Sequence, residues 1–150
     1  MDLEEAYDKI YRYVYFRLKD QSAAEDITQE TFLRCLSKKG NVREYEMQYL
    51  YTIARNLCID EYRRVKPEAL SEDEEVGTTA PFDGLEDKMM VREALAKLPL
   101  EDQELLLLRY ANNEPIGMIC KALQLSRFAV YRRLKSAEER FRGSLEVDEE

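Results

Sequence analysis

A stretch in the middle of the chain constrains the fold most, because it divides the sequence into two short parts. Residues 67–87 read PEALSEDEEVGTTAPFDGLED and combine Pro and Gly with eight acidic and no basic side chains. No sustained periodicity runs through them, so the sequence predicts a flexible, extended linker. The flanking segments, 1–66 and 88–150, each have the length of one small domain. We therefore expect two domains with separate cores.

The net charge of -8 is unevenly distributed, which matters for the partners that the chain can bind. Segment 1–66 carries 12 basic and 12 acidic side chains, and segment 88–150 carries 11 of each. The whole excess of acid thus falls in the linker, and the flanking segments can form local basic faces. An acidic total therefore does not exclude a nucleic-acid partner.

Composition narrows the classes of function further. The sequence has 5 Gly and 4 Pro, which favours helices over a turn-rich β fold. It has no His, so the commonest general base and metal ligand is missing. We expect no metal, no cofactor and no enzyme, although carboxylate chemistry stays open. Cys35, Cys58 and Cys120 lie far apart in helical patterns, which predicts reduced core residues rather than a disulfide framework.

Two features bear on location. No apolar run approaches the length that spans a membrane. The N-terminal sequence MDLEEAYDK is too acidic and polar for a signal peptide. We therefore expect a cytoplasmic protein without membrane insertion.

Three helices are predicted in segment 1–66 from the spacing of apolar residues. The first covers about residues 2–19. The second covers about 23–37, where Ser22 and Glu25 have the spacing of a capping box. The third covers residues 49–64 and ends before Pro67. The expected buried stripes are Ala6, Ile10, Tyr13, Val14 and Leu18 in the first helix, and Leu50, Ile53, Ala54 and Leu57 in the third.

The second of these helices is apolar on two sides. Ile27 and Cys35 lie on one face, and Leu33 and Leu36 lie roughly on the other. A helix with two apolar faces needs two partners. One partner is its own bundle. The other is either more of the same bundle or a second protein, and the pattern is equally consistent with both.

The outer face of the third helix carries amide, guanidinium and aromatic groups. Amides and guanidiniums pair with base edges or phosphates, and rings stack on an unpaired base. An ordinary solvated face explains the same pattern, so both interpretations stay open at this point. The residues concerned are Thr52, Asn56 and Arg63, flanked by Tyr49 and Arg55.

Four helices are predicted in segment 88–150, at about 88–98, 101–111, 115–123 and 126–142. The last two, with Ser126 as the expected N-cap, have the dimensions of a helix-turn-helix. Short helix pairs are common in all-α proteins, but a basic outer face on the second helix favours DNA. That face carries Arg127, Phe128, Tyr131, Arg132 and Lys135, opposite a buried stripe of Val130, Leu134, Ala137 and Phe141.

Three sequence blocks resemble a known family. AEDITQETFLRCL at 24–36 and YLYTIARNLCIDEYRR at 49–64 resemble the second conserved region of bacterial sigma factors of the sigma-70 family. ALAKLPLEDQELLLLRY at 94–110, with the helix-turn-helix after it, resembles their fourth region. The short length and the linker are similar to the extracytoplasmic-function (ECF) class. The resemblance implies an all-α protein with a region 2 bundle at 1–66, an acidic linker at 67–87 and a region 4 helix-turn-helix at 88–150.

The resemblance also implies roles. The chain would bind core RNA polymerase, direct initiation at promoters with −35 and −10 elements, and be held by an anti-sigma factor. A coiled coil on the largest polymerase subunit would meet the positions of Asp26, Gln29, Glu30 and Phe32. The −10 element would be held by Tyr45, Tyr49, Thr52, Arg55, Asn56 and Arg63. The −35 element would be read by Ser126, Arg127, Phe128, Tyr131, Arg132 and Lys135.

Three features depart from the family pattern or vary within it. The family often has an aromatic residue where Glu46 stands and Trp where Tyr49 stands, so either Tyr45 or Tyr49 would capture the base. Gln124 replaces a usual glycine and is expected to strain the turn slightly. The positions that vary with promoter sequence, so that the −35 sequence does not follow, are Arg127, Phe128 and Tyr131.

Two other interpretations compete with this one. A helix-turn-helix regulator that binds duplex DNA without polymerase would leave the 24–36 helix unexplained. A helical adaptor with no nucleic-acid role predicts no salt-dependent promoter binding in the presence of core polymerase.

Overall fold

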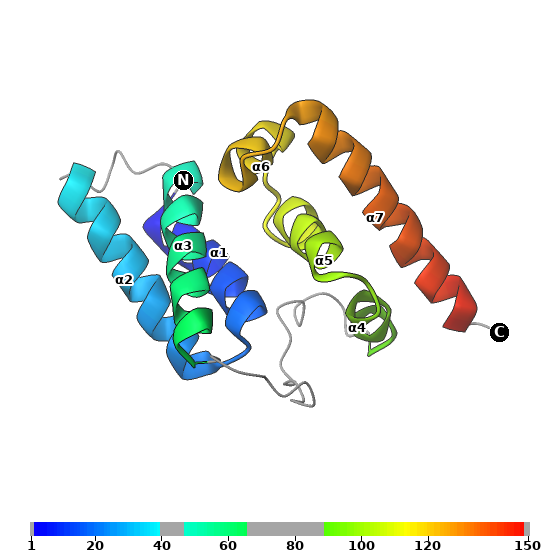
Figure 1. The fold of residues 1–150 in the computed structure, drawn as a ribbon, viewed down its shortest axis with the longest axis horizontal. Coiled ribbons are helices and arrows are strands. Elements are labelled where there is room, and N and C mark those ends of the chain that lie inside the picture. The colour runs from blue at the N-terminus through cyan, green and yellow to red at the C-terminus, as the bar shows by residue number, and fades with distance from the viewer. Residues whose placement is uncertain (1, 40–46, 66–88, 149–150) are drawn as a thin grey trace. The chain divides into compact units, whose positions relative to one another are not determined.

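The computed structural model describes residues 2–39, 47–65 and 89–148, and every regular element in these ranges is helical. The all-α class predicted from the sequence is therefore confirmed. The chain forms two compact units (Figure 1). The predicted linker lies outside the described residues. The first unit contains α1 (Leu3–Leu18), α2 (Gln21–Lys39) and α3 (Met47–Val65). The second contains α4 (Met89–Ala96), α5 (Leu100–Leu106), a π-helical turn η2 (Leu107–Ala111), α6 (Ile116–Leu123) and α7 (Arg127–Asp148).

Helix α1 has a defined residue at each end. The Asp2 carboxylate accepts hydrogen bonds from the N–H groups of Glu4 (3.1 Å) and Glu5 (3.3 Å), which satisfies amides that a helix N-terminus leaves unpaired. Lys19 closes the helix with φ 55°, and its N–H donates to the Tyr15 carbonyl at 2.7 Å. The buried residues are Ala6, Ile10, Tyr13 and Val14, as predicted, with Phe16 in place of the half-exposed Leu18.

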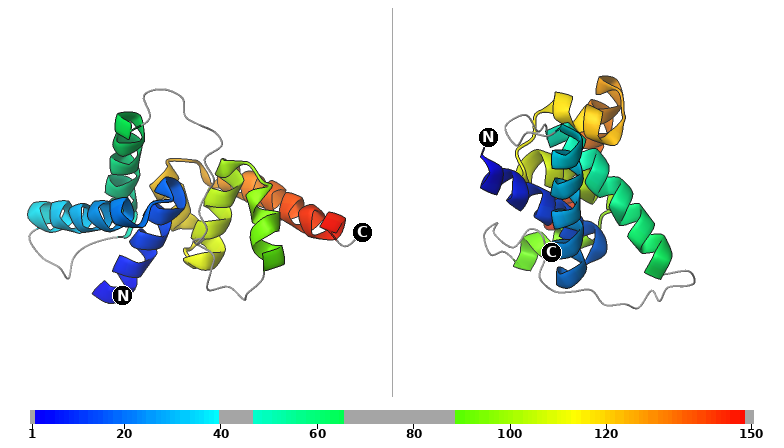
Figure 2. Two further views of the ribbon diagram at one scale, coloured as in Figure 1. Left: turned by 90° about the horizontal axis from the view of Figure 1, so that it is seen from below. Right: turned by 90° about the vertical axis from the view of Figure 1, so that its left-hand side faces the viewer.

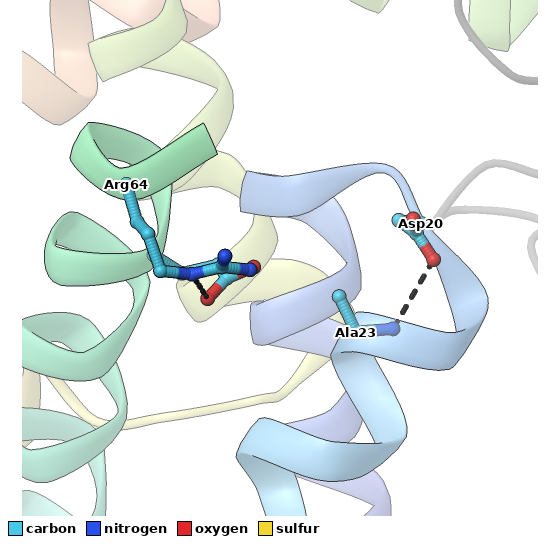
Figure 3. Close-up of polar contacts among 4 residues, drawn as sticks. Asp20, Ala23 and Arg64 are labelled. Carbon is cyan, nitrogen blue, oxygen red and sulfur yellow. Dashed lines mark hydrogen bonds and ion pairs between the residues drawn. The ribbon is translucent and has the colours of Figure 1, made fainter. Parts of the chain in front are cut away.

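Helix α2 begins at Gln21, earlier than predicted. The Asp20 carboxylate accepts a hydrogen bond from the Ala23 N–H at 3.1 Å (Figure 3). Asp20 is therefore the capping residue, and the capping role expected for Ser22 is wrong, because Ser22 lies inside the first turn. The left-handed residue Lys19 turns the chain directly into Asp20, so α2 starts without a longer connection.

The buried face of α3 is rotated relative to the prediction. Ile53 and Leu57 are only half-buried, so the expected stripe is partly wrong. The Tyr51 ring instead packs edge-on against Tyr13 of α1, with centroids 5.6 Å apart and planes at 83°. Edge-to-face aromatic pairs are favourable beyond the area they bury, which explains why Tyr51 takes the core position. The buried residues of α3 are Met47, Leu50, Tyr51, Ala54 and Cys58.

The second unit is built along α7, with α4, α5 and α6 all packed against it. Helix α7 is seen along its length in Figure 1, and its C-terminal part also in the left view of Figure 2; it extends to Asp148, beyond the predicted end at about Arg142. Its predicted stripe is confirmed for Val130, Leu134 and Ala137, whereas Phe141 is half-exposed. Other core residues of this unit are Ala94, Leu95, Leu98, Leu105, Leu106, Leu107, Leu108, Ile116, Ile119 and Ala122.

The connections of the second unit are less regular than predicted. Helix α4 ends at Ala96, before the expected end at Leu98, and the Leu98 N–H donates to the Leu95 carbonyl at 3.1 Å in a tighter turn. The helix expected over 101–111 changes to the π-helical turn η2, in which the Asn112 N–H reaches the Leu107 carbonyl at 2.9 Å. A run of leucines carries no local signal for that change.

The turns around α6 use specific residues. Asn113, between η2 and α6, has φ 56°. Pro115 is the N-cap of α6 rather than its first residue, and its carbonyl accepts from Met118 (3.0 Å) and Ile119 (3.2 Å).

None of the three cysteines forms a disulfide, as predicted. Cys35 and Cys58 are buried in the first unit, whereas Cys120 on α6 is only half-buried. Within the described ranges, no helix is long and apolar enough to cross a membrane.

Candidate functional site

The outer face of α2 combines acidic, amide and apolar side chains. Asp26 and Gln29 are exposed, and Glu30 forms an ion pair with Arg34 at 2.8 Å. Leu33 is 62% exposed. Of the two explanations for the apolar groups on this side of α2, burial within the bundle therefore does not hold for Leu33.

The inner face of α2 is closed by packing and by hydrogen bonds within the helix. Thr28 is buried and its hydroxyl donates to the Ala24 carbonyl at 2.7 Å, and Thr31 bonds in the same way within the helix. Phe32 is 9% exposed, and its ring stacks on Tyr7 of α1 with centroids 5.6 Å apart. The structure thus places Phe32 in the bundle, while the other three residues predicted on this helix lie at its surface.

Five residues predicted to meet the −10 element lie on the outer face of α3. Asn56 and Arg63 are exposed. Tyr49, Thr52 and Arg55 are half-exposed, which leaves part of each side chain within reach of a ligand. The sixth residue, Tyr45, lies outside the described residues.

Two neighbouring arginines at the end of α3, Arg63 and Arg64, differ in their contacts. Arg64 donates from Nε and Nη2 to the two carboxylate oxygens of Glu61, at 3.2 and 2.9 Å (Figure 3). This hydrogen bonding raises the pKa of the Arg64 guanidinium. Tyr62 (55% exposed) and Val65 (53% exposed) lie beside these residues and were not singled out from the sequence. The carboxylate of Glu61 thus engages Arg64, and its neighbour Arg63 is exposed.

The turn between α6 and α7 consists of residues 124–126. Gln124 adopts a left-handed conformation (φ 58°, ψ 50°), which costs a non-glycine residue about 1–2 kcal/mol. The Leu125 N–H donates to the Cys120 carbonyl at 3.0 Å. The Ser126 hydroxyl oxygen accepts from the Ala129 N–H at 3.0 Å, which confirms Ser126 as the N-cap of α7.

The first turns of α7 present a basic and aromatic face. Phe128 is 73% and Tyr131 53% exposed, and the Arg132 guanidinium lies over the Phe128 ring, 5.5 Å from its centroid. Arg127 extends back toward α6, where its Nη2 lies 3.5 Å from the point that a Cβ of Gly117 would occupy. The structure brings all six predicted −35 residues to this exposed end: Ser126, Arg127, Phe128, Tyr131, Arg132 and Lys135.

The far half of α7 is anchored by polar contacts that the sequence did not reveal. Arg140 donates to the buried Asp102 carboxylate at 2.6 Å. The Tyr110 hydroxyl donates to Glu138 at 2.5 Å, and this hydrogen bond raises the pKa of Tyr110. The partners are far apart in sequence, so helical periodicity cannot pair them. Among the described residues, no group of three or more possible metal ligands is present.

Models of known protein families match both units of the chain. The family model for Sigma-70 region 2 matches residues 3–67, and the model for Sigma-70, region 4 matches residues 88–141. The ECF RNA polymerase sigma factor SigW of Bacillus subtilis is 28% identical, over 85% of this chain and 84% of SigW. SigL of Mycobacterium tuberculosis is also 28% identical, over 91% of this chain and 82% of SigL. BldN of Streptomyces coelicolor is 42% identical over 59 residues, which cover 37% of this chain and 22% of BldN.

A solved structure shows the same fold. The sigma factor RpoE of Bartonella quintana, in complex with the anti-sigma factor NepR, matches with a TM-score of 0.73 over 97% of this chain and 95% of RpoE, at 19% sequence identity. The two family models follow one another in the order of the two units and together cover most of the sequence. The chain therefore belongs to the sigma-70 family of RNA polymerase sigma factors, in its extracytoplasmic-function class.

Proposed function

We propose that this protein binds core RNA polymerase and directs transcription initiation at promoters with −35 and −10 elements. The observation that carries the proposal is the exposed basic and aromatic face on the first turns of α7, within the region 4 match. Residues 1–66 act on polymerase and the −10 element, 67–87 connect, and 88–150 read the −35 element. The chain carries out no catalytic step and acts in the cytoplasm, where polymerase meets the promoter.

The polymerase contact lies on the outer face of α2. Asp26, Gln29 and Glu30 supply polar contacts to a coiled coil on the largest subunit, and Leu33 supplies an apolar contact at the same surface. Phe32 supports this surface through its packing on Tyr7. Such a mixture of acid, amide and leucine suits a helical partner with basic groups.

The double variant Gln29→Ala/Glu30→Ala tests this surface. We expect it to bind core polymerase more weakly than the wild type in a fluorescence competition assay, because both exposed polar groups are lost. Asp8→Ala is the matched control, since it removes one exposed carboxylate from α1. A folded double variant that binds as tightly as the wild type contradicts the assignment.

We also propose control by an anti-sigma factor. The RpoE structure was solved with the anti-sigma factor NepR, and the chains share a fold, which supports a comparable inhibitor here. The linker that the sequence predicts at 67–87 would let two domains rearrange around such a partner. Affinity purification from the native cell is expected to recover a small inhibitory protein. Recovery of polymerase with no such partner counts against this proposal.

The decisive experiment is transcription in vitro with purified core polymerase from the promoter upstream of this protein's own operon. We expect a defined transcript only when the protein is added. Arg132→Ala should reduce it, whereas Arg142→Ala removes the same charge about 15 Å further along α7 and should not. A regulator that works without polymerase would bind the duplex alone and produce no transcript, and an adaptor would do neither.

A further inference from the structure

Phe128 is an exposed aromatic residue at the start of α7. Its ring is 73% exposed, the largest exposed fraction among the large apolar side chains of the described residues. It lies in the first turn of α7, next to the N-cap Ser126, which fixes the direction in which the helix begins. On a DNA-facing helix, an exposed apolar side chain such as Phe can contact an apolar group in the major groove. The ring is therefore a candidate for contact with an apolar group on the partner of α7.

The ring also holds a neighbouring side chain. The Arg132 guanidinium carbon lies 5.5 Å from the Phe128 centroid, one helical turn further along α7. A guanidinium stacked on a ring loses less conformational freedom when it forms its hydrogen bonds. Since Arg132 covers one face of the ring, the edge and the other face remain for a ligand. Phe128 and Arg132 thus form a preorganised pair, in which an apolar ring lies beside the hydrogen-bond donors of a guanidinium held in one orientation.

The major groove of DNA presents one group that suits Phe128 and another that suits Arg132. The 5-methyl group of thymine is the apolar group on the base edges, and guanine presents O6 and N7 as two acceptors for a guanidinium. Two side chains one helical turn apart are about 6 Å apart along the helix, and base pairs stack about 3.4 Å apart. Neighbouring base pairs are therefore within reach of both side chains together.

We propose that Phe128 and Arg132 read two adjacent base pairs of the −35 element, a thymine through its 5-methyl group and a guanine through O6 and N7. This inference rests on the proposed function of α7 and specifies its DNA target. Arg132 contacts the guanine directly. Phe128 has two tasks, since it contacts the methyl group and positions Arg132.

The test uses holoenzyme assembled from the full chain and core polymerase. A duplex library with a randomised −35 region is selected for binding. The selected site is then synthesised with base analogues that each lack one chemical group. Deoxyuridine in place of thymidine removes only the methyl group, and 7-deazaguanine removes only the N7 acceptor. We expect the wild type to lose about fourfold in affinity with deoxyuridine and about tenfold with 7-deazaguanine.

Variants separate the two tasks of Phe128. In Phe128→Ala the penalty for deoxyuridine should disappear, and in Phe128→Leu it should persist while the penalty for 7-deazaguanine falls. Arg142→Ala, on the same helix, should keep both wild-type penalties. The ring is exposed, so both Phe128 variants should keep the wild-type unfolding midpoint.

Each outcome decides between the claims. If Phe128→Ala keeps the full deoxyuridine penalty, or the selected site has no thymine beside a guanine, this inference is wrong while the proposed function stands. If the library returns no preferred −35 sequence, the proposed function itself is wrong, and the inference is overturned with it.

Discussion

The two units reach stability by different means. The first unit has a regular helical core rich in rings, with Tyr13 and Tyr51 fully buried and Phe32 stacked on Tyr7. Its buried threonine hydroxyls bond within their own helix. The second unit has an aliphatic core, but it also buries several polar or charged side chains and contains a π-helical turn and two left-handed residues. These buried polar residues are Asp102, Glu104, Asn112 and Glu114.

The difference reflects which helical surfaces each unit exposes to its partners. The first unit exposes the long faces of α2 and α3, so regular helices packed through large rings are sufficient. The second unit has to hold a short helix across a long one at a fixed angle, which requires tight turns and directional contacts such as that of Asp102 with Arg140. Changes of side-chain size should therefore damage the first unit most, and loss of single polar contacts the second.

The largest effect is expected from Tyr51→Ala in the first unit. Tyr51 is 1% exposed, and truncation of a fully buried ring should lower the free energy of unfolding by about 4 kcal/mol. Denaturant unfolding followed by amide hydrogen exchange should locate the loss in α1 to α3. Tyr62→Ala, on the same helix but 55% exposed, is the control and should change stability by less than about 0.5 kcal/mol. Equal losses in the two variants would remove the distinction between core and surface rings.

The corresponding change in the second unit is Arg140→Ala. It leaves the Asp102 carboxylate buried without its ion-pair partner, and the expected loss is about 2 kcal/mol, because Arg140 itself is 53% exposed. Thermal unfolding of the full chain measures the loss. Arg64→Ala breaks an exposed ion pair in the first unit and should leave the unfolding midpoint unchanged. If the Arg64 variant is the less stable of the two, the contrast between the units is wrong.

A third pair of variants tests the division of labour on promoter DNA. Removing a stacking ring with Tyr49→Ala should cost roughly 1–3 kcal/mol of binding to the melted strand, while closed promoter binding persists. Arg132→Ala should weaken duplex binding yet still act on a template already opened at −10. Fluorescence of a probe at −10 follows opening. Normal opening kinetics in a folded Tyr49→Ala variant would show that this ring only packs.

The smallest effect is expected at the turn before α7. Gln124→Gly should stabilise the second unit by about 1 kcal/mol, because glycine adopts φ 58° without the steric cost of a Cβ. The gain in unfolding midpoint is measurable by calorimetry. Gln103→Gly is the opposite control, since it places glycine inside α5 and should destabilise. No gain at Gln124 would mean that its side chain compensates for the backbone.

Much of this architecture follows from local rules in the sequence. The N-cap at Ser126 and the buried positions Val130, Leu134 and Ala137 on α7 depend on neighbours within a few residues, and these predictions are confirmed. The exposed face at the start of α7 follows from the same periodicity. The roles of the predicted site residues on α2, α3 and α7 stay predictions.

What the sequence missed depends on contacts between helices. Ser22 and Asp20 are both good caps, and the reversal at Lys19 decides between them. Tyr51 displaces Ile53 from the core because Tyr13 lies opposite, which hydropathy does not encode. To predict such a cap or core residue, one must first know which helices pack against each other.

The unequal exposure of the three thiols has a practical consequence. Alkylating reagents reach a sulfur only where solvent does, so Cys35 and Cys58 are protected while the native fold persists. Cys120, half-buried on α6, can take a fluorescent maleimide without any engineered mutation. A dye attached there would sit on the helix that precedes α7 and would report directly on promoter and inhibitor binding by the second unit.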